Sequence, residues 1–188
     1  MRGPLILAAA SPRRLDLLRQ VGLEPAAIDP ADIDETARPA EPPRAYALRM
    51  AEAKLAAVAP RHPGATVLAA DSVVALGRRI LPKAESEAEA RRCLALLSGR
   101  RHRVLGGLAV AVDGGKVRTR LVESVVRFKR LTAADIDAYI QSGEWKGKAG
   151  GYAIQGRAAE FVAFISGSYS NVVGLPLFET MALLKAVS

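Results

Sequence analysis

The chain has 188 residues, of which 50% are hydrophobic, and carries a formal net charge of +8 at pH 7. This length and composition favour a single folded domain over residues 1–188 with a substantial core, and they exclude a disordered chain. No apolar run approaches the roughly 20 residues that a membrane-spanning helix needs, so we expect no membrane partner. The single cysteine, Cys93, excludes an internal disulfide framework and is typical of a cytoplasmic protein.

The basic charge favours partners that carry phosphate, either nucleotides or nucleic acid. Its arginines form scattered pairs rather than one basic block, and aromatic residues make up only 5% of the chain. A nucleic-acid-binding module needs a contiguous basic face with stacking aromatics, and the acidic segment 29–35 would repel a phosphate backbone. We therefore expect no nucleic acid partner, and keep a basic nucleic-acid-binding module as the competing class of function.

The first predicted elements are a strand over residues 5–10 and a helix directly after it. Ser11 is a favourable N-cap and Pro12 a favourable first helical residue. The unpaired N–H groups at the start of a helix attract anions, so Ser11 and Arg14 are candidate phosphate-binding residues, with Arg13 adding charge. An ordinary strand–helix junction with solvated arginines is an equal alternative.

The stretch 67–76 is apolar and long enough for a buried strand, yet Asp71 lies in its middle. A buried carboxylate is costly unless it is paired, metal-bound or protonated. Asp71 is therefore either the cap of a turn at the strand end or a catalytic group displayed towards a cleft. The helical pattern over residues 42–59 places Lys54 at the border of its apolar stripe, where it either extends to water or points into that cleft.

Residues 23–41 read as a Pro-rich, acidic loop. Its carboxylates, including Glu35, suit a hard cation such as Mg²⁺, and they equally suit a solvated loop. His62 lies in a Pro-Gly turn and is expected to be incidental.

The rest of the pattern alternates strands and helices around one hairpin, which predicts an α/β fold with a mixed sheet. The expected elements are a short extended piece at 80–83, helices at 86–97 and 132–141, a hairpin of 103–112 and 116–129, a Gly-rich loop at 144–157, a strand at 161–166, a polar turn at 167–171 and a final helix to about residue 186.

Common nucleotide and hydrolase motifs are absent from the sequence. Segment 143–149 lacks the spacing and the hydroxyl residue of a Walker A loop, and no Gly-x-Gly-x-x-Gly follows a strand. Two histidines and one cysteine cannot form a structural zinc site. Neither His62 nor His102, which lies between arginines, is a convincing base for a Ser-His-Asp triad.

Several stretches together resemble the Maf family of nucleoside triphosphate pyrophosphatases. They are ASPRR at 10–14, Asp34 and Glu35, Lys54, ADSVV at 70–74, Lys83, SGRRHRV at 98–104, GKAGGYAIQG at 147–156 and GSYSNVVGLP at 167–176. One such motif is weak, but this set, in order over nearly the whole chain, is highly specific.

The resemblance implies a mixed, elongated central sheet flanked by helices, with two lobes around a cleft. It also implies hydrolysis of the bond between the α- and β-phosphates of a nucleoside triphosphate, with a divalent cation, Mg²⁺ or Mn²⁺, as cofactor. The Arg-Arg after Ser-Pro and the Ile-Gln-Gly segment resemble the branch that prefers dTTP and UTP. A house-cleaning enzyme for other modified or purine nucleotides, such as 7-methyl-GTP, is the alternative, and a homodimer is left open.

By position, Asp71 matches the proton acceptor of that family. Glu35, Lys54 and Lys83 match the charged residues around the phosphates and the metal, so Glu35 and Asp71 are the expected metal ligands. This agrees with the chemistry, since phosphoanhydride hydrolysis needs a base for water, cations on the phosphates and a metal on phosphate oxygens.

The residues that set base preference match Arg13, Ser72 and Gln155. The chain departs from the family pattern twice, because Ser72 and Gly106 stand where Thr is usual. Serine keeps the hydroxyl but loses a methyl group, so we expect looser base discrimination. In a regular strand Asp71 and Ser72 face opposite sides, so one nucleotide can touch both only if the strand ends or bends there.

Overall fold

The computed structural model describes residues 3–187, and these divide into two compact units. Unit 1 takes the described residues of Met1–Ser72, Gly106–Val122 and Gly174–Ser188, and unit 2 takes Val73–Leu105 and Glu123–Val173. Three long strands therefore contribute residues to both units.

The described residues form a mixed sheet of seven strands, in the order β2-β1-β3-β6-β7-β9, with β4 paired to β3. The strands are β1 (Leu5–Ala8), β2 (Ala27–Ile28), β3 (Thr66–Leu76), β4 (Arg79–Leu81), β6 (Arg101–Val112), β7 (Arg118–Phe128) and β9 (Val162–Ser166). A separate pair joins β5 (Lys83–Ala84) to β8 (Lys148–Ala149). β1 runs parallel to β2 and β3, whereas β4 is antiparallel to β3 and β9 to β7, so the predicted mixed α/β fold is confirmed.

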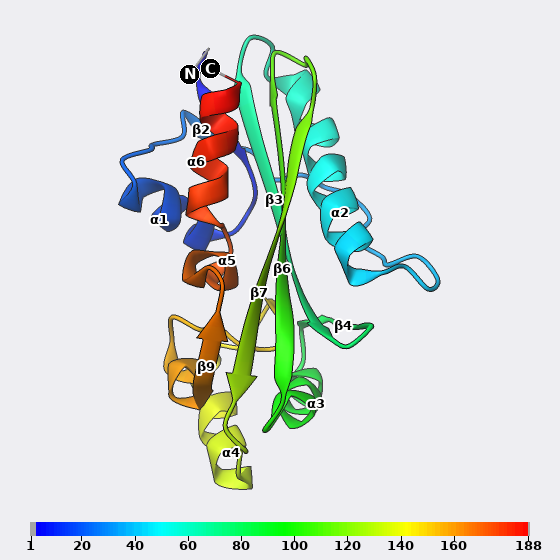
Figure 1. The fold of residues 1–188 in the computed structure, drawn as a ribbon, viewed down its shortest axis with the longest axis vertical. Coiled ribbons are helices and arrows are strands. Elements are labelled where there is room, and N and C mark those ends of the chain that lie inside the picture. Colours follow the sequence, from blue (N-terminus) through cyan, green and yellow to red (C-terminus); the bar gives the residue numbers. More distant parts are fainter. Residues whose placement is uncertain (1–2, 188) are drawn as a thin grey trace. The chain divides into compact units, whose positions relative to one another are not determined.

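Helices flank this sheet (Figure 1). They are α1 (Pro12–Gln20), α2 (Pro43–Val58), α3 (Glu87–Leu97), α4 (Ala133–Ser142), α5 (Tyr169–Val173) and α6 (Leu177–Ala186), with 3₁₀ turns η1 (Ala59–Arg61) and η2 (Arg157–Phe161). Over residues 3–187 we find no helix with the length and apolar character needed to cross a bilayer.

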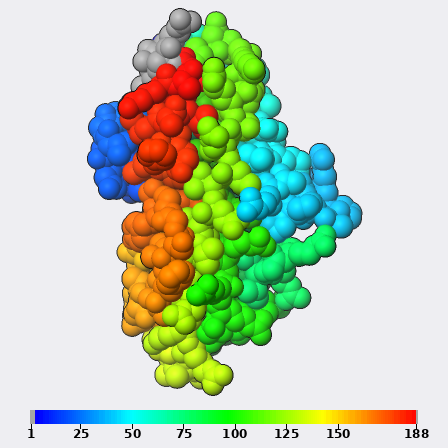
Figure 2. All heavy atoms as spheres, in the orientation of Figure 1, coloured from blue at the N-terminus to red at the C-terminus, as the bar shows by residue number. Residues whose placement is uncertain are grey.

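In unit 1, α2 lies on one side of the strands, and α1 and α6 lie beside each other on the other side (Figures 1 and 2). β1 is buried along its whole length, as expected of a central parallel strand. The apolar stripe of α2, with Leu55 and Val58, packs against Val67 of β3. Gly107 lets α2 approach β6 closely, because a Cβ atom there would lie 2.1 Å from the carbonyl oxygen of Ala47.

The turn between β6 and β7 confirms the predicted hairpin loop. Asp113 and Gly114 have φ angles of 50° and 65°, and the N–H of Gly115 donates to the carbonyl of Val112 at 2.8 Å. Positive φ at both central residues defines a type I′ turn, which matches the twist of paired strands.

Two capping boxes begin the helices predicted at 86–97 and 132–141. The Ser86 side chain accepts from the N–H of Glu89 before α3, and that of Thr132 accepts from the N–H of Asp135 before α4. Gly143 ends α4 in the left-handed conformation. Local sequence signals therefore determine these helix ends.

The prediction of a polar turn over 167–171 is wrong in part, because α5 begins within it. The Oγ atom of Ser168 accepts from the N–H of Asn171 at 3.2 Å, which caps the short helix. The buried Asn171 amide donates to the carbonyl of Val104 and to Oγ of Ser124, both at 3.1 Å. Contacts distant in sequence thus stabilise a helix that composition alone does not indicate.

Short elements were also missed, namely β2 and β8 in segments read as loops and η2 between the Gly-rich loop and the strand after it. None is long enough to show a hydrophobic period. The extended piece predicted at 80–83 is present as parts of β4 and β5. His62 is not incidental to the structure, because its Nε2 atom lies 2.7 Å from Oδ2 of Asp29, which also contacts Nε of Arg61 at 3.0 Å. This cluster joins η1 to the segment after β2.

Candidate active site

Asp71 lies on the face of β3 that α2 covers. Side chains alternate along a strand, and Val67 and Ala69 pack into the core beneath α2, so Asp71 continues the same face. Asp71 is only 3% exposed and Lys54 only 7%. The predicted carboxylate is therefore buried and faces a lysine from the helix.

Lys54 binds two carboxylates at once. Its Nζ atom lies 2.6 Å from Oδ1 of Asp71 and 2.7 Å from Oε1 of Glu35. Lys54 therefore does not extend to water, the commoner behaviour of a lysine at the edge of an apolar stripe. A buried charge is tolerated only when it is paired. Here the Lys54 ammonium pairs with two carboxylates, that of Asp71 on β3 and that of Glu35 in the loop before α2.

Ser72 points to the other side of β3. The buried side chain of Arg14, from α1, donates through Nη2 to Oγ of Ser72 at 3.1 Å and through Nε to the carbonyl of Gly174 at 2.9 Å. Burial lowers the pKa of Arg14, while the charges of Asp71 and Glu35 raise it. Because β3 continues without a break to Leu76, the structure does not bring the Ser72 side chain to the side of Asp71.

The N-terminus of α1 lies in the same unit. Ser11 is the N-cap residue and Pro12 follows at the first helical position, as predicted, but the Ser11 side chain makes no capping hydrogen bond. Its hydroxyl therefore satisfies none of the free N–H groups there. Arg13 is half-buried in the first turn of the helix.

Lys83 and Gln155 belong to unit 2. Lys83 begins β5 and is exposed. Gln155 is exposed in a turn that the N–H of Gly156 closes on the carbonyl of Ala153 at 3.1 Å. Within residues 3–187 its amide makes no hydrogen bond, so it does not cap its own loop.

The predicted metal ligands form a pair, not a larger cluster. Among the described residues, no group of three or more His, Cys, Asp or Glu side chains is placed to hold a metal ion. In the acidic loop, Asp29 is engaged by His62, and Asp34 accepts from the N–H of Thr36 at 2.8 Å. Mg²⁺ is commonly held by one or two carboxylates together with substrate phosphates. The donor chemistry of Asp71 and Glu35 fits such a shared site.

The family described as Maf-like protein matches residues 4–187. The chain belongs to the Maf family.

Three similar curated proteins carry the same name. A "dTTP/UTP pyrophosphatase" of Rhodospirillum rubrum is 65% identical over 97% of this chain and 87% of its own length. Proteins with the same name from Paramagnetospirillum magneticum and Caulobacter vibrioides are 63% and 59% identical, over 96% and 98% of this chain and 95% and 96% of their own lengths. The solved structure of a HAM1 protein from Coxiella burnetii is similar in fold, with a TM-score of 0.50 at 16% identity, over 97% of this chain and 98% of that chain.

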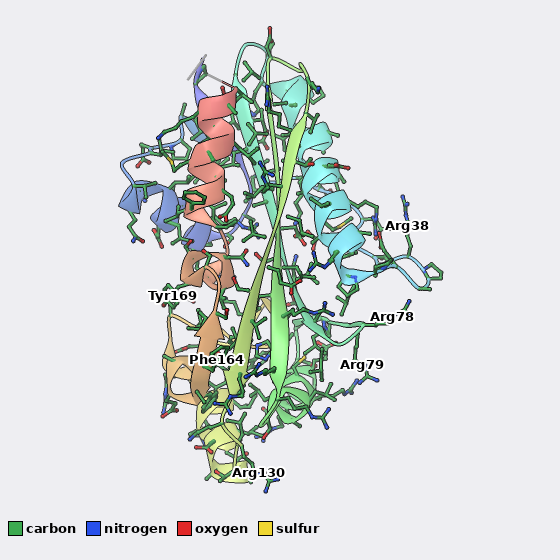
Figure 3. All side chains as sticks on the ribbon, in the orientation of Figure 1. Arg38, Arg78, Arg79, Arg130, Phe164 and Tyr169 are labelled. Carbon is green, nitrogen blue, oxygen red and sulfur yellow. The ribbon has the colours of Figure 1, made fainter. Side chains whose placement is uncertain are left out.

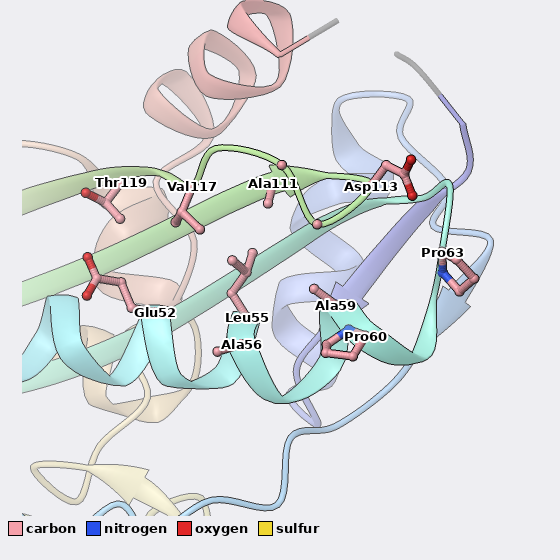
Figure 4. Close-up of a pocket in the computed structure, with 12 residues that line it drawn as sticks. Glu52, Leu55, Ala56, Ala59, Pro60, Pro63, Ala111, Asp113, Val117 and Thr119 are labelled. Atoms are coloured by element: carbon pink, nitrogen blue, oxygen red, sulfur yellow. The ribbon is translucent and has the colours of Figure 1, made fainter.

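A cavity of about 660 Å³ lies elsewhere in unit 1 of this Maf protein, between the end of α2 and the β6–β7 turn (Figure 4). Its walls include Glu52, Leu55, Pro60, Ala111, Val117 and Thr119. Neither Asp71, Lys54 nor Glu35 lines it, so its position gives no support for catalysis there.

Sequence reasoning missed two residues beside the site, Tyr46 and Arg49. The hydroxyl of Tyr46 donates to the carbonyl of Glu35 at 2.7 Å, and Nη2 of Arg49 donates to the carbonyl of Thr36 at 3.1 Å. The available signal was spacing, since Tyr46, Met50 and Lys54 recur every four residues on one face of α2.

Proposed function

We propose that this Maf protein hydrolyses the α–β phosphoanhydride bond of dTTP and UTP, giving the nucleoside monophosphate and pyrophosphate. The observation that carries the proposal is the ion-paired group in which Lys54 binds Glu35 and the buried Asp71. It occurs in a chain that is 65% identical, over 97% of its length, to a protein named dTTP/UTP pyrophosphatase.

Asp71 is the proposed proton acceptor. Attack of water on the α-phosphorus forms a P–O bond, breaks the bond to the bridging oxygen and releases pyrophosphate, and the proton of the water passes to the Asp71 carboxylate. β3 holds Asp71 from a rigid, buried strand, which favours a fixed direction of approach for the water.

Positive groups balance the charge of the triphosphate. Lys54 is held next to Asp71 by its two ion pairs, and Lys83 is the proposed second cation. A divalent cation, Mg²⁺ or Mn²⁺, held by Asp71, Glu35 and the phosphates would neutralise further charge and polarise the phosphoryl oxygens.

Base preference is proposed to rest on Arg13, Ser72 and Gln155. The amide of Gln155 is exposed and bonds to no other described residue, so it is available to a ligand. Ser72 already accepts from Arg14, which fixes its hydroxyl. Ser11 and Arg14 are proposed to assist in binding phosphate.

We propose a cytoplasmic protein acting on free nucleotides, with neither nucleic acid nor membrane as partner. The single cysteine supports the reducing compartment. In unit 2, the adjacent Arg78 and Arg79 point outward, as does Arg130 (Figure 3). The scattered arginines and the aromatic content of 5% support the absence of a nucleic acid partner.

A substrate panel tests the proposal. Pyrophosphate release is measured with dTTP, UTP, CTP, GTP and 7-methyl-GTP, beside a gel shift with single-stranded DNA. We expect rapid release from dTTP and UTP and no shift. Preferred cleavage of 7-methyl-GTP would indicate the other branch of the family, and DNA binding without pyrophosphate release would overturn the enzymatic assignment.

A further inference from the structure

Glu35 needs an external support for its position. It lies in a long segment without helix or strand between β2 and α2, yet its carboxylate oxygen meets Nζ of Lys54 at 2.7 Å. Loop segments are more mobile than the elements they connect, so a carboxylate that acts in a site must be held by its neighbours.

Two side chains of α2 supply that support. The hydroxyl of Tyr46 donates to the carbonyl of Glu35 at 2.7 Å. One turn later, Nη2 of Arg49 donates to the carbonyl of Thr36 at 3.1 Å. The carbonyls of Glu35 and of the next residue, Thr36, are thus both fixed to the helix that also carries Lys54.

Tyr46 and Arg49 are themselves held in place. Tyr46 is only 9% exposed, and Cζ of Arg49 lies 5.4 Å from the centre of its ring. Arg49 also makes a two-point ion pair with Glu41, with Nε and Nη2 each 2.6 Å from a carboxylate oxygen. A two-point pair fixes the direction of a guanidinium as well as its distance.

We propose that Tyr46 is a positioning residue for the reaction: its hydroxyl holds the Glu35 backbone so that the carboxylate stays beside Lys54, in reach of the divalent cation. The inference rests on the proposed function, since it gives Tyr46 its effect through the metal ligand Glu35. This role requires no contact of Tyr46 with the nucleotide or the metal.

The test uses Tyr46→Phe, which removes one oxygen and keeps the ring in place. We expect the Mg²⁺ concentration for half-maximal pyrophosphate release to rise about 3- to 10-fold, as the loss of one hydrogen bond predicts. The KM for UTP at saturating Mg²⁺ should change much less. Binding of Mn²⁺ in the presence of a non-hydrolysable UTP analogue, followed by electron paramagnetic resonance, should weaken by a similar factor.

Tyr139→Phe is the matched control. It also removes a buried tyrosine hydroxyl that bonds to the backbone, here by accepting from the N–H of Ala153 at 3.1 Å in unit 2. We expect a comparable loss of thermal stability and an unchanged Mg²⁺ requirement. If the Mg²⁺ requirement rose equally in both variants, the change would reflect lost stability and not the position of Glu35. That result would overturn the inference.

A double variant separates the remaining outcomes. In a Glu35→Gln background, Tyr46→Phe should change the metal requirement little further, because the group it positions is already altered. If the effects of Glu35→Gln and Tyr46→Phe on the Mg²⁺ requirement were fully additive, the role of Tyr46 would be refuted. A normal Mg²⁺ requirement in Tyr46→Phe alone would refute it too. If the wild type released no pyrophosphate, the proposed function would fail, and Mn²⁺ binding would still decide the role of Tyr46.

Discussion

Nζ of Lys54 lies 2.6 Å from Oδ1 of Asp71, and the two side chains are only 8% and 4% exposed. This pair joins α2 to β3 at a point where the surrounding core is otherwise apolar. Removing one partner of a buried pair leaves an uncompensated charge, and this usually costs more than the pair contributes. We therefore expect changes to this contact to affect both the stability of the protein and its activity.

Lys54→Met should both destabilise the protein and abolish activity. It leaves the Asp71 carboxylate buried without its cation, and we expect the free energy of unfolding to fall by about 3 kcal/mol or more. Chemical denaturation and pyrophosphate release measure the two effects.

The double variant Lys54→Met with Asp71→Leu removes both buried charges. We expect it to recover much of the lost stability, because well-packed apolar residues replace a buried pair at little cost. Activity should stay absent. A double variant as unstable as Lys54→Met would show that the carboxylate is not the source of the destabilisation.

Asp71→Asn should abolish hydrolysis and leave the fold intact. Asparagine has nearly the shape of aspartate and can still accept from Lys54, but it cannot take a proton from water. Loss of a positioned base costs about 10²- to 10⁴-fold in rate. Circular dichroism checks the fold, and near-normal turnover in the folded variant would make Asp71 a structural residue.

Removal of divalent cations should abolish pyrophosphate release, with recovery on addition of Mg²⁺ or Mn²⁺. The carboxylates of Asp71 and Glu35, the proposed ligands, offer oxygen atoms, which suit these ions. Glu35→Gln should raise the Mg²⁺ requirement and leave the UTP to CTP ratio unchanged. Full activity after exhaustive chelation would exclude the cation, and a changed base ratio would place Glu35 near the base.

Much of the fold could be predicted because its signals are local. The capping boxes at Ser86 and Thr132 and the Asp113-Gly114 turn each depend on residues within a few positions. α5 could not be predicted in this way, since its buried Asn171 bonds to strand residues 47 and 67 positions earlier.

The site was predictable in its residues but not in its contacts. Asp71 was notable as a carboxylate in an apolar strand, and Lys54 as a cation beside an apolar stripe. Their pairing depends on the packing of α2 over β3, which no sequence period determines. Tyr46 was not predicted because its hydroxyl donates to a backbone carbonyl. Every residue has such a carbonyl, so the sequence does not indicate which one accepts the hydrogen bond.

His102 should make stability depend on pH. It is buried, with Nε2 2.7 Å from the Tyr152 hydroxyl, and burial lowers the pKa of His102 from 6.5 to about 4. Between pH 6.5 and 4 the unfolded chain binds a proton that the folded chain does not. The free energy of unfolding therefore decreases as pH falls, by about 3 kcal/mol over this window, and His102 adds no further loss below it.

His102→Gln removes this titration. Urea unfolding at pH 7 and pH 4.5 should show a smaller loss of stability in the variant than in the wild type, although the variant starts from a lower value at pH 7. Carboxylates contribute equally to both proteins and cancel in the comparison. The same pH dependence in both would show that His102 is protonated alike in the folded and unfolded chains.

Base preference should depend on Gln155. Uracil and thymine present carbonyl acceptors beside one N–H donor, so an amide can accept from the N–H and donate to a carbonyl, while Arg13 donates to the other carbonyl. Cytosine presents a ring acceptor and an amine donor, so hydrogen-bonding groups of Gln155 and Arg13 would stay unpaired, at a cost of about 1–3 kcal/mol each.

We expect competition assays to show UTP and dTTP cleaved well ahead of CTP and GTP, and Gln155→Ala to narrow that difference in cleavage. Because the Gln155 amide bonds to no other described residue, the variant should keep its stability. An unchanged preference in a stable variant would exclude Gln155 from reading the base.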